Sequence, residues 1–471
     1  MTFSDKERFV GEEAKNIASF YPKSTIMCLK KLLGQKYDSD ACADVRIRYS
    51  TKLAESNGRV LFKVDYRQKE MLLSPEQIAS MLLRKMKTLA ENNLGFKVSD
   101  AVIAVPVYFN NEQRQAVLDA AEIAGLNVLK LINEPTAAAV SFKYNNRDAV
   151  LKNVLIFDAG GGGLNVALVD IGKDKIEVKG IGGTTEVSGE AIVQSMMKHF
   201  IEEMKSHFGS SFEMTEKNLV KLRNACEISK QKLQLQLPSW TEKILNVSNE
   251  QDFDCSIDQS LFKEVTNHVP NLVNKVLDDL LTDTDINSQD VQDVVLCGGT
   301  SRVLILQKTL TSYLGNGNFN KTINADEAVA AGATLVANFP SSNDSAANFE
   351  VYDIIPNCFH RKDADSKRIT IPQHGVKEFK IGNKQSSITH CDIIAAIKSL
   401  NRHTSEWNIS KLKETVDQFD ADAEQDKALS VATNEFEEFC LSIKKKFNAN
   451  GEYSNVDESV RQEMMNMCDD A

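Results

Sequence analysis

The sequence predicts an α/β fold, and three segments indicate it. Residues 154–169 read as two apolar strands joined by a turn of four glycines. Residues 101–133 read as strand, helix and strand, an order typical of two parallel strands with a helical crossover. Residues 294–314 read as a strand, a Gly-Gly turn and a helix, in which the turn brings the backbone close to a ligand.

Helix signals frame these segments in chain order. Residues 74–93 read as an amphipathic helix, with Ser74 as N-cap, a proline in the first turn and Gly95 as the stop. Residues 110–124 read as a helix that asparagines open and Gly125 closes. The short apolar run at residues 101–107 is the expected strand between these two helices.

Composition is that of an ordinary globular protein, and it excludes several function classes. The length of 471 residues allows about three domains. The net charge of −11 argues against sequence-independent nucleic-acid binding, which needs a basic face. The charged beginning predicts no signal peptide, and we expect no membrane partner because no apolar run is long enough to span one. The nine cysteines form no C-x-x-C pair, which favours reduced thiols and a cytoplasmic, or nuclear, location.

The glycine turn at residues 160–163 is the clearest candidate for a binding site. Only glycine turns so sharply, and successive glycines point their N–H groups into one concavity that can cradle an anion. Asp158 lies just before the turn, where a carboxylate suits a Mg²⁺ ion that shares the phosphate charge. A glycine-rich hairpin without a ligand is the alternative, since short glycine motifs have many false positives.

Three motifs together resemble the 70-kilodalton heat-shock protein (Hsp70) chaperone family. Residues 153–169, N-V-L-I-F-D-A-G-G-G-G-L-N-V-A-L-V, are similar to its phosphate loop, D-L-G-G-G-T-F-D-V. Residues 129–139, L-K-L-I-N-E-P-T-A-A-A, are similar to its I-N-E-P-T-A-A-A run. Residues 293–302, D-V-V-L-C-G-G-T-S-R, are similar to its adenosine loop. The resemblance covers about residues 6–339 and resumes over residues 410–447.

The resemblance implies an actin-like, two-lobed ATPase domain over residues 1–340, incomplete at its start. Residues 5–17 are similar to a family segment that normally follows three β-strands and a first phosphate loop of the D-L-G-T-T type, and this chain lacks both. A sheet without those strands has unpaired edges, and the phosphate cradle lacks one half. We therefore expect a rearranged or less stable lobe, or a shortened gene product.

The resemblance also assigns catalytic positions to Lys30, Glu134 and Asp158. Lys30 matches the family's catalytic lysine, whose compact charge would stabilise phosphoryl transfer; a solvated helix lysine is the alternative. Glu134 matches the glutamate that organises metal and water near the phosphates; a polar strand end is the alternative. Asp158 matches the family aspartate and would hold Mg²⁺ through water.

Two substitutions in the phosphate loop are expected to weaken hydrolysis. Gly163 stands where the family has a threonine, which removes a hydroxyl contact to the γ-phosphate. Asn165 stands where the family has a second aspartate, and an amide cannot act as a base and holds a Mg²⁺ shell less well. With the first loop also absent, the residues favour nucleotide binding over turnover.

The resemblance places the adenosine between a helix at residues 219–237 and the second glycine turn. Glu227 and Lys230 lie on one helix face and could bond the ribose; a solvated helix face is the alternative. Gln231 replaces an arginine that packs on the base, whereas Arg302 could stack on adenine. The residues predicted to bind ATP or ADP are Gly160, Gly161, Gly162, Gly163, Glu227, Lys230, Gly298, Gly299, Thr300, Ser301, Arg302 and Asp326.

The C-terminal third is predicted to be a shortened substrate region. Residues 341–356 are the expected linker, because F-E-V-Y-D-I-I-P at residues 349–356 resembles the family's interdomain linker. Residues 357–408 are too short for its β-sandwich, although strands at 368–371 and 378–381 could remain. Residues 409–471 resemble the start of its helical lid, with residues 426–439 similar to the second lid helix. We therefore do not expect a groove for unfolded peptides.

Three functions are consistent with these patterns. The family implies an ATP-dependent chaperone that works with J-domain co-chaperones and nucleotide-exchange factors. The substitutions favour an Hsp70-like homologue that binds ATP and hydrolyses it weakly or not at all, or a non-catalytic interaction module for co-chaperones. A sugar kinase of the same superfold fits least, because the I-N-E-P-T-A-A-A run and the lid segment are similar to chaperones.

Overall fold

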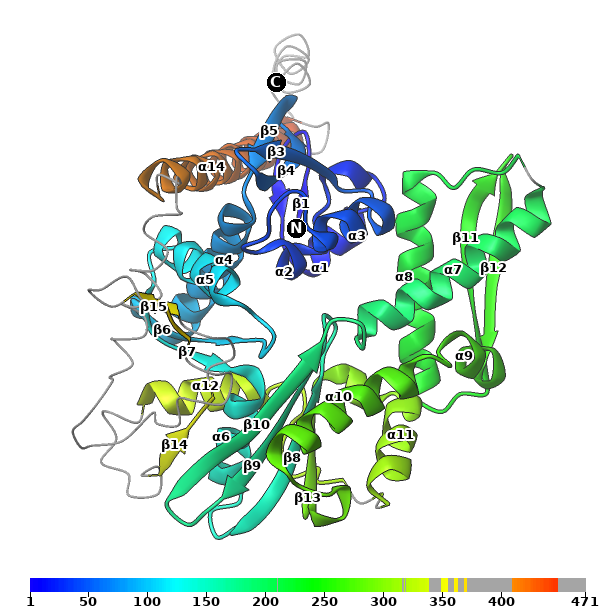
Figure 1. Ribbon diagram of the computed structural model, residues 1–471. Helices are drawn as coiled ribbons and strands as arrows, with labels where there is room; N and C mark the ends of the chain where they lie inside the picture. The colour runs from blue at the N-terminus through cyan, green and yellow to red at the C-terminus, as the bar shows by residue number, and fades with distance from the viewer. Residues whose placement is uncertain are drawn as a thin grey trace. The chain divides into compact units, whose positions relative to one another are not determined.

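The computed structural model describes residues 1–209, 211–315, 317, 319–338, 349–354, 360–362, 368–370 and 409–447. The chain divides into two units, residues 1–409 and residues 410–471. The larger unit contains the three predicted α/β segments (Figure 1).

A five-stranded sheet forms the centre of the larger unit, in the order β13-β8-β9-β10-β14. Its middle is antiparallel and comprises β8 (Leu151–Ala159), β9 (Leu164–Ile171) and β10 (Lys175–Thr184). The outer strands run parallel to their neighbours and are β13 (Asp293–Cys297) and β14 (Glu350–Tyr352). The predicted strand–glycine turn–strand unit is therefore confirmed as the β8–β9 hairpin.

Alternate residues of β8 enter two different hydrophobic clusters, as the two-residue period of a strand requires. Val154 and Ile156 pack with α6 (Glu134–Asn145) and α12 (Ala328–Asn338). Leu155 and Phe157 belong to the opposite cluster, to which α7 (Gly189–Phe208), α10 (Val269–Thr284) and α11 (Leu304–Leu314) contribute. Figure 1 shows α6 and α10 on opposite faces of the sheet. Burial on both faces explains the continuous apolar runs at residues 154–157 and 166–169.

A second, two-stranded sheet lies beside the N-terminal end of α6. Its strands are β6 (Asp100–Val105) and β7 (Asn127–Asn133), which are parallel and joined by α5 (Asn111–Ile123). The predicted crossover is confirmed. Within the described part of the chain, β6 pairs with β7 alone, and its apolar residues Val102 and Ile103 remain partly exposed. The expected unpaired sheet edge is therefore present at β6.

The first hundred residues form short elements around a three-stranded antiparallel sheet of β3, β4 and β5. The helix α4 (Pro75–Leu94) begins with a capping box between Ser74 and Gln77 and ends at Gly95 in the left-handed region, as predicted. The other elements are β1 (Thr2–Phe3), β2 (Arg8–Phe9), α1 (Glu12–Ile17), η1 (Pro22–Ser24), α2 (Leu29–Leu32), α3 (Asp40–Arg48), β3 (Lys52–Ser56), β4 (Arg59–Tyr66) and β5 (Lys69–Leu73).

The segment between β10 and β13 carries three long helices, α7, α8 and α10, and a hairpin. The predicted helix at residues 219–237 is α8 (Glu216–Gln234), and it packs on the hairpin of β11 (Ser239–Ser248) and β12 (Gln251–Asp258). The helices α9 (Gln259–Val265) and α10 and the single turn η2 (Ser288–Asp290) complete this segment. The single turn η3 (Gly299–Arg302) follows β13.

Helices α6 and α12 approach each other unusually closely. A Cβ atom added to Gly332 of α12 would lie 1.7 Å from the carbonyl oxygen of Ala137 in α6 and 2.5 Å from its carbonyl carbon. Glycine at position 332 is therefore required for this close approach.

Part of the predicted substrate region is described. The strand β16 (Arg368–Thr370) agrees with the predicted strand at 368–371, and it pairs with β15 (His360–Lys362). The predicted strand at 378–381 and residues 341–348 of the predicted linker lie outside the described residues. The helix α14 (Ile409–Phe447) contains the predicted lid helix at 426–439. None of the described helices combines the length and apolar composition that crossing a lipid bilayer requires.

Candidate functional site

Glu134 is the centre of a polar chain that joins three separate elements. It is the first residue of α6, directly after β7. Lys30 of α2 places its Nζ atom 2.6 Å from Glu134 Oε1. The Nδ2 atom of Asn165 in β9 donates to Glu134 Oε2 at 2.7 Å. The structure thus brings Lys30, Glu134 and Asn165 together, and both carboxylate oxygens of Glu134 are engaged.

The amide of Asn165 suits this position better than a carboxylate would. The side chain is 3% exposed, and its Oδ1 accepts the backbone N–H of Val107 at 2.9 Å. Its nitrogen donates to Glu134, and Asn165 also bonds to Asp158, which lies opposite it in the β8–β9 register. One neutral amide therefore separates two carboxylates and satisfies a backbone donor.

Asp158 ends β8 in a buried position and is 6% exposed. Burial, followed by the negative charge of Glu134, raises its pKa to about 7, although Lys30 and the bond from Asn165 act in the opposite direction. The turn after β13 presses on this carboxyl, because a Cβ on Gly298 would lie 2.8 Å from Asp158 Oδ1. Gly298 also has a φ of 75°, so both the lack of space and the left-handed backbone require glycine at this position.

Replacing Asp158 with asparagine is expected to stabilise the nucleotide-free protein at pH 8 and to leave its stability nearly unchanged at pH 4. The folded chain keeps a proton that the unfolded chain releases at its ordinary pKa near 3.8, so stability falls as the pH rises through about 7. At about 1.4 kcal/mol per pKa unit, the full cost approaches about 4 kcal/mol, and we expect a gain of about 2 kcal/mol. Urea unfolding of the wild type and Asp158→Asn between pH 4 and pH 8 measures this gain in the free energy of unfolding. If the two proteins show parallel pH profiles, the prediction is wrong.

The glycine turn has the geometry of an anion cradle. The N–H of Gly160 closes the turn on the carbonyl oxygen of Gly163 at 2.9 Å. The carbonyl oxygens of Gly160 and Gly161 accept the N–H groups of Gly189 and Glu190 at the start of α7. The N–H groups of Gly161 and Gly162 donate to no residue in the described ranges. A Cβ on either glycine would meet no atom within 4 Å, so the space above the turn is open.

This open space belongs to a cavity of about 890 Å³. Lys30 and Gly162 line it, together with Tyr108 and Glu190. Lys30 and Gly162 therefore border one space, and a lysine ammonium and unpaired backbone N–H groups are the kinds of group that bind phosphate. The predicted adenosine residues Glu227, Lys230 and Arg302 do not line this cavity.

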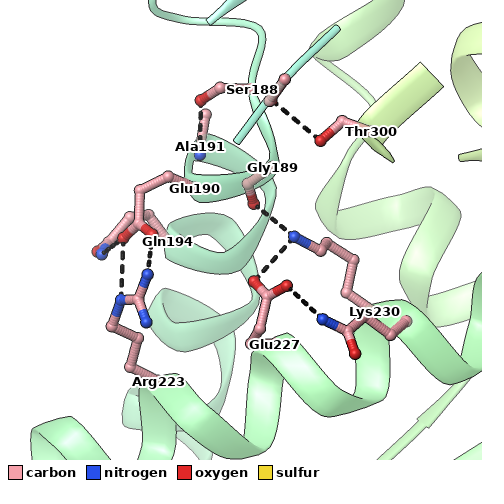
Figure 2. Close-up of polar contacts among 11 residues, drawn as sticks. Ser188, Gly189, Glu190, Ala191, Gln194, Arg223, Glu227, Lys230 and Thr300 are labelled. Carbon is pink, nitrogen blue, oxygen red and sulfur yellow. Dashed lines mark hydrogen bonds and ion pairs between the residues drawn. The ribbon is translucent and has the colours of Figure 1, made fainter. Parts of the chain in front are cut away.

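On the adenosine side, Lys230 of α8 fastens the helix to the start of α7, as Figure 2 shows. Its Nζ atom lies 2.8 Å from Glu227 Oε2 and 3.2 Å from the carbonyl oxygen of Gly189. The Nε2 atom of Gln231 donates to the other Glu227 oxygen at 2.9 Å. Lys230 is only 5% exposed, so the alternative of a solvated helix face does not hold for it.

The second glycine turn uses most of its side chains within the protein. Thr300 Oγ1 donates to the carbonyl oxygen of Gly160 at 3.0 Å, which joins the two glycine turns, and Ser301 Oγ donates to the carbonyl oxygen of Gly298. Arg302 forms a bidentate ion pair with Asp326, with nitrogen–oxygen distances of 2.9 and 2.6 Å. Both side chains are about half exposed. The guanidinium plane is therefore oriented beside the turn, as a stacking surface requires.

Sequence reasoning missed a buried network on the far side of Glu134. After β14, Asp353 accepts the hydroxyl of Thr136 at 2.7 Å and the Nδ2 group of Asn133 at 3.0 Å. Asn133 also accepts a bond from Arg114 at 2.8 Å. Asn133 and Thr136 flank Glu134 within the I-N-E-P-T run, which was the available signal.

A second missed cluster lies at the rim of the cavity, around Glu190. Arg223 of α8 pairs with this carboxylate, and Gln194 donates to it at 2.8 Å (Figure 2). The hydroxyl of Tyr49, which follows α3, bonds to the same group. Three separated segments therefore meet at one carboxylate.

A metal ion would need ligands from outside the protein. Within the described residues, no three His, Cys, Asp or Glu side chains converge on one point. Glu134 and Asp158 nevertheless present two carboxylates beside the cradle. This donor set fits Mg²⁺ bound by phosphate oxygens and water, with Asp158 holding a water ligand.

Comparison with known proteins gives a consistent result. The family described as "Hsp70 protein" matches residues 1–388. The "Heat shock 70 kDa protein" of Neurospora crassa is 37% identical over 360 residues, which are 76% of this chain and 55% of that protein. A ribosome-associated molecular chaperone of Zygosaccharomyces rouxii is 34% identical, with 76% and 59% covered. The matched region thus spans little more than half of each relative's length.

Proposed function

Because this chain belongs to the Hsp70 family and has its actin-like ATPase fold, we propose that it is a chaperone homologue that binds ATP or ADP and hydrolyses ATP weakly or not at all. The nucleotide-binding part would comprise residues 1–340, followed by a linker at 341–356. Residues 357–408 would be a shortened substrate region, and residues 409–471 a lid-like segment.

The engagement of both Glu134 oxygens carries the hydrolytic half of this proposal. A carboxylate that positions or deprotonates a water needs an available lone pair directed at the reacting phosphate. In this chain one oxygen pairs with Lys30 and the other accepts from Asn165. Neither Asn165 nor Gly163 can replace it, since an amide is no base and glycine has no hydroxyl. Turnover would require this network to rearrange.

The cradle supports the binding half of the proposal. Gly161 and Gly162 would bind the phosphates through their N–H groups, Lys30 would add a positive charge, and Arg302 would stack on adenine. A bound Mg²⁺ ion would supply charge that neutralises the phosphates, with Asp158 on its water shell. The docked strand β14 also supports a functional linker, since it joins the sheet that carries the cradle.

Family membership suggests which classes of protein this chain binds. Hsp70 proteins work with J-domain proteins and nucleotide-exchange factors, and one matched relative is named a ribosome-associated chaperone. We propose the same classes of co-chaperone here, in the cytosol or nucleus. Binding of unfolded peptides is not part of this proposal.

Calorimetry with ATP and with ADP, each with and without Mg²⁺, tests the binding half. Binding of both nucleotides is expected. The test variant is Gly162→Val, whose added Cβ would meet no protein atom within 4 Å and whose side chain is expected to occupy the cradle. This variant is expected to keep its melting temperature and to lose more than tenfold in affinity.

Single-turnover hydrolysis on the same samples tests the other half. Absence of binding by the folded chain would contradict the proposal and favour a nucleotide-independent interaction module. Efficient hydrolysis would contradict only the claim of weakened turnover. Equal affinity in Gly162→Val would place the nucleotide elsewhere.

A further inference from the structure

Tyr108 occupies the space that a side chain at position 163 would need. A Cβ atom added to Gly163 would lie 2.4 Å from the hydroxyl oxygen of Tyr108 and 3.0 Å from its Cζ atom. The backbone of Gly163 does not have a positive φ, so its conformation does not require glycine. A side chain at position 163 would therefore have to displace the Tyr108 hydroxyl, and its Cβ atom would also lie 3.0 Å from the carbonyl oxygen of Thr184.

The ring of Tyr108 is held in place on several sides. Tyr108 packs edge-on against Phe109, with ring centroids 5.9 Å apart. A Cβ on Gly183 would lie 3.1 Å from Tyr108 Cδ1, so the ring also lies against the end of β10. The preceding residue, Val107, is fixed through its N–H to Asn165. The hydroxyl position is thus set by the fold.

The Tyr108 hydroxyl is available to a ligand. The side chain lines the same cavity as Lys30 and Gly162, and no residue in the described ranges accepts or donates a hydrogen bond at its hydroxyl. Burial, followed by the negative charges of Glu134 and Asp158, raises the pKa of Tyr108 well above its ordinary value. The phenol therefore stays protonated and can donate a hydrogen bond.

We propose that the Tyr108 hydroxyl replaces the side-chain hydroxyl absent at position 163 and donates a hydrogen bond to the terminal phosphate of a bound nucleoside triphosphate. This inference rests on the proposed nucleotide binding and deepens it. It makes Tyr108 a residue that distinguishes a triphosphate from a diphosphate, because a diphosphate has no terminal group at this point of the cradle. It also explains how the chain tolerates glycine where a hydroxyl would otherwise contact the phosphate.

Calorimetry on Tyr108→Phe tests the phosphate contact. Affinity for a non-hydrolysable ATP analogue is expected to fall about tenfold, the loss that follows when one hydrogen bond to a charged acceptor is removed. Affinity for ADP is expected to change less than twofold. The matched control is Tyr144→Phe, since Tyr144 lies on α6, contacts Arg147 and does not line the cavity. This control is expected to leave both affinities unchanged.

Each other outcome of this experiment has a distinct meaning. Equal losses for the two nucleotides would overturn the inference and identify Tyr108 as a packing residue. An unchanged preference for the triphosphate would overturn it as well. If the wild-type chain binds neither nucleotide, the proposed function fails first, and this inference fails with it.

A double-mutant cycle tests the geometry without any nucleotide. Gly163→Ala is expected to lower the urea midpoint in the wild-type background, because the methyl group must displace the Tyr108 hydroxyl. In the Tyr108→Phe background the nearest atom is gone, and the same substitution is expected to lower the midpoint by half as much or less. Additive effects would contradict the claim that this hydroxyl fills the space.

Discussion

Replacing Asn165 with aspartate is expected to destabilise the protein by about 3 kcal/mol at pH 8 and not to restore ATP hydrolysis. An aspartate could still accept the N–H of Val107, but it could no longer donate to Glu134 or Asp158. Three carboxylates would then share a buried site with one partly exposed lysine, Lys30. Turnover would stay low, because Gly163 has no hydroxyl and Glu134 remains paired with Lys30.

The pH dependence separates this cause from simple loss of packing. At low pH the added carboxyl is protonated and can donate again, so the destabilisation should shrink as the pH falls. Urea unfolding at pH 5 and pH 8 measures the difference, and a single-turnover assay measures hydrolysis. Asn267→Asp is the matched control, because Asn267 is exposed and the added charge should change stability by less than about 0.5 kcal/mol. Robust turnover in Asn165→Asp, or equal destabilisation at both pH values, would refute this explanation.

Replacing Gly332 with alanine is expected to lower the free energy of unfolding by at least about 3 kcal/mol, or to prevent folding. The added methyl carbon would lie 1.7 Å from the carbonyl oxygen of Ala137, so α6 and α12 would have to separate. Helix propensity alone predicts the opposite sign, since alanine is about 1 kcal/mol better than glycine inside a helix. The sign of the change therefore reports the helix contact directly.

Two companion variants define the cause. Ala331→Gly changes an exposed position of the same helix and should cost only about 1 kcal/mol, the propensity difference. Ala137→Gly should not rescue Gly332→Ala, because the obstructing atom belongs to the backbone of α6. Denaturant unfolding, or soluble yield where unfolding cannot be followed, measures these effects. Rescue by Ala137→Gly would show that the two helices can adjust.

Elements whose signals are local could be predicted from the sequence. The β8–β9 hairpin was predicted from two apolar runs around four glycines, and α4 from Ser74 and Gly95. The parallel pairing of β6 and β7 followed from the intervening helix. These features depend on backbone geometry and capping over a few residues, which the sequence displays directly.

Tertiary effects at the site could not be predicted in the same way. From the sequence, Asn165 is only a position that lacks the carboxylate of the family. The structure shows that its amide joins Glu134, Asp158 and Val107. From the sequence, Gly163 is likewise only a position that lacks the threonine hydroxyl, because no local pattern predicts that Tyr108 lies against it. The roles of Asn165 and Gly163 depend on contacts between residues that are far apart in the sequence, and local patterns do not predict such contacts.

Asn133 and Glu134 are consecutive residues that bind different parts of the protein, and the peptide bond between them connects these two sets of contacts. Asn133 grips Asp353 beyond β14, while Glu134 holds Lys30 and Asn165 at the cradle. The peptide bond between Asn133 and Glu134 is planar and rigid. A ligand that moves Lys30 away from Glu134 would therefore also change the force on Asn133, which binds Asp353. Occupancy of the cradle and attachment of that segment are therefore expected to be linked thermodynamically, and the linkage must be equal in both directions.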